Sequence, residues 1–327
     1  MQDNSIRLFC VAPMMGYTTP YARKLYRILT KKAFLFTEMI ASKSLINSKN
    51  KDLIIENDRH NPVALQVGGS DLNDLKKCSN IAYSYNYDEI NLNVGCPSKA
   101  VQKGSFGACL MKDKVLVRQC LESLQNNKIE VSLKCRIGLG RKTNYEFFEE
   151  FIDEVSKSGI KIIYVHARNA ILTGISPSQN RSIPPLDYTF VSRIKLKYPN
   201  ISFILNGGIN SLDMVYSLLK DYDGVMLGRL IQHNPFLLKQ VDKNIYLDDK
   251  VIDVNEGLIE DYFEYIKTKT GLDSMFRLLS PLLQIFFGIP NSKIYKSQIH
   301  EYIQKGNLIL IEELLKNFVK QNKILLN

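Results

Sequence analysis

Two patterns alternate along the chain: short apolar runs and longer amphipathic stretches. Near-continuous apolar strands that alternate with helices are typical of a parallel sheet, and eight such units predict a TIM (β/α)8 barrel. A doubly wound open sheet is the alternative, but no G-x-G-x-x-G motif follows the first run. The apolar runs are residues 8–13, 34–39, 63–67, 89–94, 131–136, 161–166, 202–206 and 224–228. Helix-length stretches between them include residues 71–85, 114–125, 145–158, 187–197 and 211–220.

The C-terminal part of the chain carries the helical pattern alone. Because apolar residues recur there at helical spacing, we predict a separate helical domain. The two domains are expected to span residues 1–243 and 244–327. The predicted helices of the second domain are residues 256–268, 274–287, 293–305 and 308–323.

Composition excludes several classes of protein. A hydrophobic content of 45% with 23% charged residues is that of an ordinary globular protein. No apolar run approaches the roughly 20 residues of a membrane span, and the polar residues 1–7 show no signal-peptide pattern, so we predict a cytoplasmic protein with no membrane contact. Six scattered cysteines without a C-x-x-C pair, and only four histidines, predict free thiols and no metal site.

The net charge of +10 suggests a polyanionic partner, because lysine and arginine release counterions when they bind phosphates. A lysine-rich composition can also reflect an AT-rich genome, so charge alone leaves nucleic acid as one of two interpretations. The excess of positive charge lies in the first domain. After residue 244 the chain has 10 basic and 11 acidic residues, which nearly balance.

The stretch NLNVGCPS, residues 91–98, is the most informative part of the sequence. Asn91 and Asn93 project to the same side of a predicted strand, where a polar ligand is one possible hydrogen-bond partner. Cys96 follows at the end of that strand, between glycine and proline. A small buried thiol in a tight turn is the alternative, since free cysteine often fills cores. A reactive cysteine is the functional interpretation.

Polar or glycine residues end nearly every predicted strand, where the active site of a TIM barrel lies. In particular, Gly207-Gly208 and Gly228-Arg229 end the last two strands. In this fold the loops after those strands usually form the phosphate-binding site. The alternative is that these glycines are only turn residues. The strand-end residues are Pro13, Met14, Met15, Glu38, Gln66, Asn91, Asn93, Cys96, Lys134, Arg136, His166, Arg168, Asn206, Gly207, Gly208, Gly228 and Arg229.

Lys134 lies within an apolar strand, which is costly unless its ammonium meets an anion. Three interpretations stay open: a Schiff-base lysine, a cation that stabilises charge on a cofactor ring, and a structural salt bridge to Glu38. His166 could likewise be a core histidine, but its place at a strand end beside Arg168 favours a ligand contact.

At these residues the chain resembles the tRNA-dihydrouridine synthases, and most closely their A-type bacterial subfamily. The resemblance covers nearly the whole length and rests on long, ordered strings. They are APM at 12–14, FTEM at 36–39, ALQVGGS at 64–70, DEINLNVGCPS at 88–98, GSFGACLM at 104–111, KCRIG at 134–138, HAR at 166–168, NR at 180–181, IPPLDY at 183–188 and NGG at 206–208.

The resemblance implies an FMN-dependent enzyme that reduces uridine in tRNA to 5,6-dihydrouridine, with NADPH reloading the flavin. It places Pro13, Met14, Met15 and Gln66 at the isoalloxazine ring and Lys134 at its N1/C2 edge. By the same analogy the ribityl phosphate would be held by His166, Asn206, Gly207, Gly208, Gly228 and Arg229. Asn93 would touch the uracil, and Cys96 would protonate C5 after hydride delivery to C6. The A-type resemblance points to uridines 20 and 20a of the D-loop.

The chemistry is reasonable without the family. Hydride addition to a conjugated C=C leaves an enolate-like carbon that needs a proton. Thiols are mostly protonated at neutral pH because their ordinary pKa is about 8.5, so a thiol can supply one. A uracil inside a folded RNA must be extruded to reach a barrel floor.

The second domain resembles the family's helical recognition domain, and FFGIP at 286–290 matches its signature. Arg181, Ser178, Lys293 and Lys296 are the implied tRNA contacts. Two positions depart from the subfamily: Ser280-Pro281 replaces a usual basic pair, and Ser178 stands where a basic residue is common. Pro281 should also kink or restart its helix.

Three functions therefore remain open. The first is a tRNA-dihydrouridine synthase acting as a monomer. The second is an FMN-dependent reductase of a free pyrimidine, against which the basic charge and the helical domain argue. The third is a noncatalytic RNA-binding module, against which the presence of Cys96, Lys134 and His166 argues.

Overall fold

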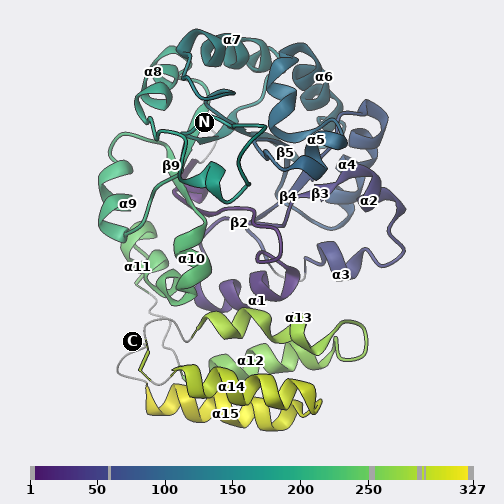
Figure 1. Ribbon diagram of the computed structural model, residues 1–327, viewed down its shortest axis with the longest axis vertical. Coiled ribbons are helices and arrows are strands. Elements are labelled where there is room, and N and C mark those ends of the chain that lie inside the picture. Colours follow the sequence, from purple (N-terminus) through teal and green to yellow (C-terminus); the bar gives the residue numbers. More distant parts are fainter. Residues whose placement is uncertain (1–3, 58–59, 250–254, 286–288, 291, 323–327) are drawn as a thin grey trace.

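The computed structural model describes residues 4–57, 60–249, 255–285, 289–290 and 292–322. A ring of parallel strands forms its centre, with helices around it (Figure 1). Strands pair in the order β1-β9-β8-β7-β6-β5-β4-β2, and a bridge between Cys10 and Phe34 joins β1 to β2, which closes the barrel. The strands are β1 (Phe9–Val11), β2 (Leu35–Phe36), β3 (Ile40–Ala41), β4 (Val63–Gly68), β5 (Glu89–Val94), β6 (Glu130–Arg136), β7 (Ile162–His166), β8 (Ser202–Asn206) and β9 (Gly224–Leu227).

The predicted TIM barrel is therefore confirmed, with one difference in the second apolar run. That run forms two short strands, β2 and β3, which both pair with β4. Between them the regular backbone pairing of the sheet is interrupted, and the Thr37 hydroxyl accepts a hydrogen bond from the Gln66 backbone N–H at 3.0 Å. The interruption brings Glu38 to the barrel mouth, where its carboxylate accepts from the Gly16 backbone N–H.

Helices cover the outside of the barrel, as the periodicity predicts, and end within a few residues of the expected positions. Their caps follow the sequence: Thr19, Asp71, Ser98, Asp113, Asn144 and Ser211 each accept a backbone N–H at a helix start. The helices are α1 (Pro20–Leu29), α2 (Ser42–Asn47), α3 (Asp52–Ile55), α4 (Leu72–Ser84), α5 (Lys99–Lys103), α6 (Lys114–Leu124), α7 (Tyr145–Ser156), α8 (Thr189–Lys197), α9 (Leu212–Leu218), α10 (Arg229–His233) and α11 (Val241–Tyr246). Short 3-10 helices are η1 (Asn4–Arg7), η2 (Gly107–Lys112), η3 (Gln179–Arg181) and η4 (Pro235–Gln240).

The C-terminal helices pack beside α1, below the barrel in Figure 1. They are α12 (Glu256–Lys267), α13 (Met275–Leu279), η5 (Ser280–Gln284), α14 (Ser292–Gln304) and α15 (Leu308–Gln321). The predicted break at Pro281 is confirmed, because α13 ends at Leu279 and a 3-10 turn follows. Proline cannot donate to the Arg277 carbonyl, which accepts from the Ser280 hydroxyl at 3.1 Å instead.

The two parts of the chain are joined by polar contacts as well as by apolar packing on α1. The Tyr21 hydroxyl donates to Asp273 at 2.9 Å, and the Tyr265 hydroxyl donates to Glu56 at 2.7 Å. The predicted boundary between residues 243 and 244 falls inside α11, and the division into domains stays a prediction. Residues 286–288 of the FFGIP signature lie outside the described residues. Within the described ranges, no helix combines the length and the apolar character needed to span a membrane.

Candidate active site

Cys96 lies, partly exposed, in the loop between β5 and α5. Its backbone N–H donates to Asn93 Oδ1 at 3.0 Å, and its carbonyl accepts from the Ala108 N–H at 2.9 Å. Gly107 has a φ of +76°, and a Cβ there would lie 2.7 Å from the Cys96 oxygen, so only glycine fits this close approach. The thiol is therefore carried by a loop that hydrogen bonds hold on both sides.

A cavity of about 610 Å³ opens at the carboxyl ends of the strands, and Cys96 lines it. The predicted substrate contacts Asn93 and Arg181 line it as well. Ser178 lies exposed in the loop after β7, while Lys293 and Lys296 lie on α14; none of these three lines the cavity. Every residue predicted to bind the cofactor lines the cavity: Pro13, Met14, Met15, Gln66, Lys134, His166, Asn206, Gly207, Gly208, Gly228 and Arg229.

Two amide side chains at the cavity, Gln66 and Asn93, are fixed by hydrogen bonds. Asn93 Nδ2 donates to Gln66 Oε1 at 2.8 Å, and Gln66 Nε2 donates to Asn91 Oδ1 at 2.7 Å. Asn91 is fully buried beneath them and does not line the cavity. The sequence pairs Asn91 with Asn93 on one strand face, and the structure separates them into a supporting residue and a cavity residue.

Basic side chains gather at one end of the cavity: Lys134, Arg136, His166 and Arg229 line it, and Arg168 lies near His166. Burial, together with Arg136, lowers the pKa of Lys134 to about 8, and burial lowers the pKa of Arg136 to about 10. The pKa of His166 falls well below its usual value, first through burial and then through its cationic neighbours. No described carboxylate appears among the groups acting on these three. Two buried cations, Lys134 and Arg136, on which no described carboxylate acts are suited to an anionic ligand.

The backbone beside this cluster leaves room for such a ligand. Gly207 has a φ of +112°, and a Cβ there would lie 2.6 Å from the His166 ring. The glycine thus lets the chain pass directly against His166 at the end of β8. The backbone of Gly207, Gly208 and Gly228 and the guanidinium group of Arg229 line the cavity there and form a set of donors that fits a phosphate.

Lys134, the lysine in β6, lines the cavity, and the described residues show no salt bridge from it to Glu38. Lys134 Nζ donates to Asn206 Oδ1 at 3.0 Å, and Asn206 Nδ2 donates to the Met226 carbonyl at 2.7 Å. Among the described residues, no ion pair joins Lys134 to Glu38. The ammonium therefore has one neutral partner and remains available to an anion.

Arg136 is a site residue to which the sequence assigned no role. Its Nε donates to the Gly95 carbonyl at 2.9 Å, and its Nη1 donates to the carbonyls of Asn169 and Asn180 at 2.9 and 3.0 Å. It thereby ties the Cys96 loop to the loop after β7. The available signal was its position two residues after Lys134, which places both side chains on one face of β6.

Tyr17 is a second residue that the sequence did not single out. It lines the cavity, and 43% of its surface is exposed, beside Met15 with 64% exposed. The loop that carries them is held by the Glu38–Gly16 hydrogen bond and by Met14 N–H donating to Thr18 Oγ1 at 3.0 Å. An aromatic residue directly after the first predicted strand end was the signal that could have found it.

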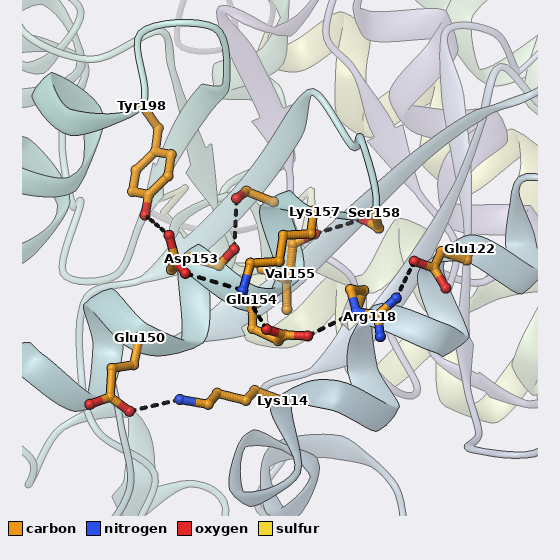
Figure 2. A network of polar contacts seen from close by, with 11 residues as sticks. Lys114, Arg118, Glu122, Glu150, Asp153, Glu154, Val155, Lys157, Ser158 and Tyr198 are labelled. Atoms are coloured by element: carbon orange, nitrogen blue, oxygen red, sulfur yellow. Dashed lines mark hydrogen bonds and ion pairs between the residues drawn. The ribbon is translucent and has the colours of Figure 1, made fainter.

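The charged residues of the surface divide into paired and unpaired groups. On the outer helices, cations meet carboxylates: Lys114 bonds Glu150 at 2.7 Å, and Arg118 bonds Glu154 at 2.8 Å (Figure 2). Around the cavity mouth the exposed cations form no ion pair with a described carboxylate. The mouth cations, which lie on the segments that follow β5, β6 and β7, are Lys99, Lys103, Arg141, Lys142 and Arg181, and of these Arg181 lines the cavity. Positive charge that is not neutralised locally thus lies where the cavity opens.

Metal ligands do not gather in the described part of the chain. No three His, Cys, Asp or Glu side chains of that part come together as a group that could hold a metal ion.

Comparison with known proteins finds similar sequences over nearly the whole chain. The model of the family "Dihydrouridine synthase (Dus)" matches residues 10–323. A protein of Shewanella oneidensis named tRNA-dihydrouridine(20/20a) synthase is 38% identical over 93% of this chain and 91% of its own length. A protein of Synechocystis sp. with the same name is 38% identical over 91% of this chain and 90% of its own. Among solved structures, morphinone reductase aligns with a TM-score of 0.49 at 10% identity, over 77% of this chain and 88% of that one. The chain belongs to the dihydrouridine synthase family of oxidoreductases.

Proposed function

We propose that this protein is an FMN-dependent tRNA-dihydrouridine synthase that reduces uridines 20 and 20a of the D-loop with NADPH. One observation carries the proposal: a single cavity joins a cluster of unneutralised cations to a loop-bound thiol. The cations suit the phosphate of a nucleotide cofactor, and the thiol suits a proton donor. The names of the relatives supply the substrate and the two positions.

The residues present fit FMN. His166, Asn206, Gly207, Gly208, Gly228 and Arg229 would hold the ribityl phosphate at the cationic end of the cavity. Pro13, Met14 and Met15 would lie against the isoalloxazine ring, with Gln66 bonding its polar edge. Lys134 would place its charge beside the N1/C2 edge, where reduced flavin carries negative charge. When bound and reduced by NADPH, FMN supplies a hydride to C6 of uracil.

The remaining step belongs to the protein. Asn93 would hold the uracil by a carbonyl oxygen, and Cys96 Sγ would give its proton to C5 on the face opposite the hydride. A uridine can reach Cys96 only if it leaves the stacked RNA, and extrusion of a base is the usual solution to this problem. Tyr17 at the rim has the exposed aromatic ring that such a base can stack upon.

The tRNA backbone would lie across the mouth of the cavity. Arg181 and the other unpaired cations of the mouth would contact phosphates, and Lys293 and Lys296 would do so on the helical domain. Ser178 and Ser280 can offer a hydroxyl but no charge, so we expect weaker contacts there than in subfamily members with basic residues. With tRNA as substrate, we expect a cytoplasmic protein, and we expect it to act as a monomer.

The flavin assignment can be checked by eye and by absorbance. We expect the purified protein to be yellow, or to become so when incubated with FMN, because the donor set and the cavity fit that cofactor. The measurement is the visible spectrum after removal of free flavin by gel filtration. A colourless protein that cannot be reconstituted would remove the flavin assignment and leave the RNA-binding module as the alternative.

The substrate can be checked by mapping dihydrouridine in tRNA. We expect tRNA from a strain lacking this gene to lose dihydrouridine at positions 20 and 20a, and purified enzyme with FMN and NADPH to restore it there. Free uracil and uridine should not be reduced, because neither can use the cations of the mouth or the helical domain. Reduction of free uracil without reduction of tRNA would favour the pyrimidine reductase instead.

A further inference from the structure

A continuous line of hydrogen bonds runs inside the barrel from its floor to the Cys96 loop. At the floor, the Glu89 carboxylate bonds Arg7 at 2.8 Å and accepts from the Ser132 hydroxyl. Ser132 Oγ in turn accepts from Asn91 Nδ2 at 2.6 Å. Asn91, Gln66, Asn93 and the Cys96 N–H continue the line to the mouth, and we name these six groups, Glu89 to Cys96, the interior ladder. Glu89, Asn91 and Asn93 alternate on β5 and span about 13 Å at about 3.3 Å per residue.

The ladder has one direction, which both of its ends impose. At the mouth, the backbone N–H groups of Gly95 and Cys96 can only donate, so the Asn93 atom that they face is its oxygen. At the floor, the carboxylate of the Arg7–Glu89 ion pair can only accept, so the Ser132 hydroxyl donates to it. Between the ends, Asn93, Gln66 and Asn91 each donate an N–H toward the floor, and Ser132 donates its O–H. Hydrogen bonds that point one way along a chain reinforce one another.

The direction of the ladder determines which hydrogen-bonding atoms of Gln66 and Asn93 are left for a ligand in the cavity. Gln66 and Asn93 each use one N–H inside the ladder and keep a second N–H, for which no described residue is an acceptor. Both residues line the cavity, so it is offered two amide donors. Carbonyl oxygens of a uracil or a flavin ring can accept these bonds. If the ladder ran in reverse, Asn93 would turn its amide nitrogen toward the N–H groups of Gly95 and Cys96, which would then lose their acceptor.

We propose that Asn91 and Ser132, which do not line the cavity, are positioning residues that fix Gln66 and Asn93 as donors toward the flavin and the uracil. Asn91 also supports Cys96 indirectly, because Asn93 holds the Cys96 N–H. Both residues are fully buried, and each bonds two ladder neighbours. The inference rests on the proposed function for the identity of the two ligands.

The test compares four variants of the full chain. Asn91→Leu removes two links of the ladder and keeps the number and branching of the side-chain heavy atoms, and Ser132→Ala removes the links to Asn91 and Glu89. Tyr164→Phe is the matched control, because the Tyr164 hydroxyl donates to the same carboxylate at 3.2 Å but lies outside the ladder. Ile162→Ala controls for packing, since Ile162 is buried in the barrel interior and has no polar group.

We expect FMN binding, measured by flavin fluorescence, to weaken about tenfold or more in Asn91→Leu and in Ser132→Ala. Tyr164→Phe and Ile162→Ala should keep the wild-type dissociation constant, even where thermal unfolding shows a lower Tm. Affinity within about twofold of wild type in both ladder variants would overturn the inference. If Asn91→Leu fails to fold, Ser132→Ala decides alone.

A second readout needs no flavin. Alkylation of Cys96 by iodoacetamide, followed by mass spectrometry on flavin-free protein, should be about threefold faster or more in the ladder variants, because the loop is less firmly held. Equal rates in all variants would count against the ladder. A wild type that binds no FMN would instead remove the proposed function, and the alkylation rates would still decide whether the ladder positions Cys96.

Discussion

Replacement of Cys96 by alanine should abolish tRNA reduction while leaving FMN bound and reducible by NADPH. The thiol is partly exposed in the cavity, on a loop fixed by Asn93 and Ala108, and makes no hydrogen bond to any residue that the structure describes. General acid catalysis typically contributes about 10²- to 10⁴-fold, so the expected loss in tRNA turnover is of that order. Stopped-flow absorbance measures flavin reduction, and dihydrouridine analysis measures turnover.

Cys109 provides the matched control for this experiment. It is a partly exposed thiol on η2, near the Cys96 loop, but it does not line the cavity. Cys109→Ala should therefore retain wild-type turnover. Wild-type turnover in Cys96→Ala would show that the proton comes from another group. Equal loss in both variants would point to disturbance of the loop rather than to proton transfer.

Replacement of Lys134 by methionine should weaken FMN binding by about tenfold or more and slow its reduction by NADPH. Methionine keeps most of the side-chain volume and removes the ammonium, which is buried with Asn206 as its neutral partner. A buried charge that meets an anion without a competing carboxylate should contribute at least this much. The dissociation constant and the rate of flavin reduction are the two measurements.

The pH dependence of binding tests the same role. Burial lowers the pKa of Lys134 to about 8, so the lysine is charged below that pH and becomes neutral above it when no ligand is bound. If the bound cofactor needs the charged form, affinity should fall as the pH rises through about 8. Lys134→Met should lack this fall over the same range. Identical pH profiles for the two proteins would contradict the assignment.

Much of the fold could be predicted because each strand is buried on both faces and therefore reads as an apolar run. The exception is instructive. The run at residues 34–39 looks continuous in sequence. In the structure, however, the Thr37 hydroxyl bonds the neighbouring strand, and the backbone pairing of the sheet is interrupted there. Apolar periodicity reports burial and does not report which backbone groups are paired. The break at Pro281 was predictable because a missing N–H is a local property.

The site was predictable to a similar extent, and for a similar reason. Barrel topology places all strand ends at one mouth, so polar strand ends such as Gln66, Lys134 and His166 had to meet. Which of them face the ligand was not predictable. Asn91 and Asn93 share a strand face, so the sequence cannot tell their roles apart. The structure does so, because Asn91 donates to Ser132 and Asn93 donates to Gln66. Arg136 was predicted as a strand-end residue but without a role, because its partners are backbone carbonyls of distant loops, which leave no pattern in sequence.

Helix α1 has a consequence for how the molecule can be divided. Eight of its ten residues are buried, whereas α6, on the outside of the barrel, buries four of eleven. The difference arises because α1 has the barrel on one side and the C-terminal helices on the other. A barrel truncated after residue 243 would expose Tyr21 and its neighbours on α1 to water, and this newly exposed surface would promote aggregation. The barrel and the C-terminal helices therefore share α1 as a packing surface, and we expect neither to persist in solution without the other.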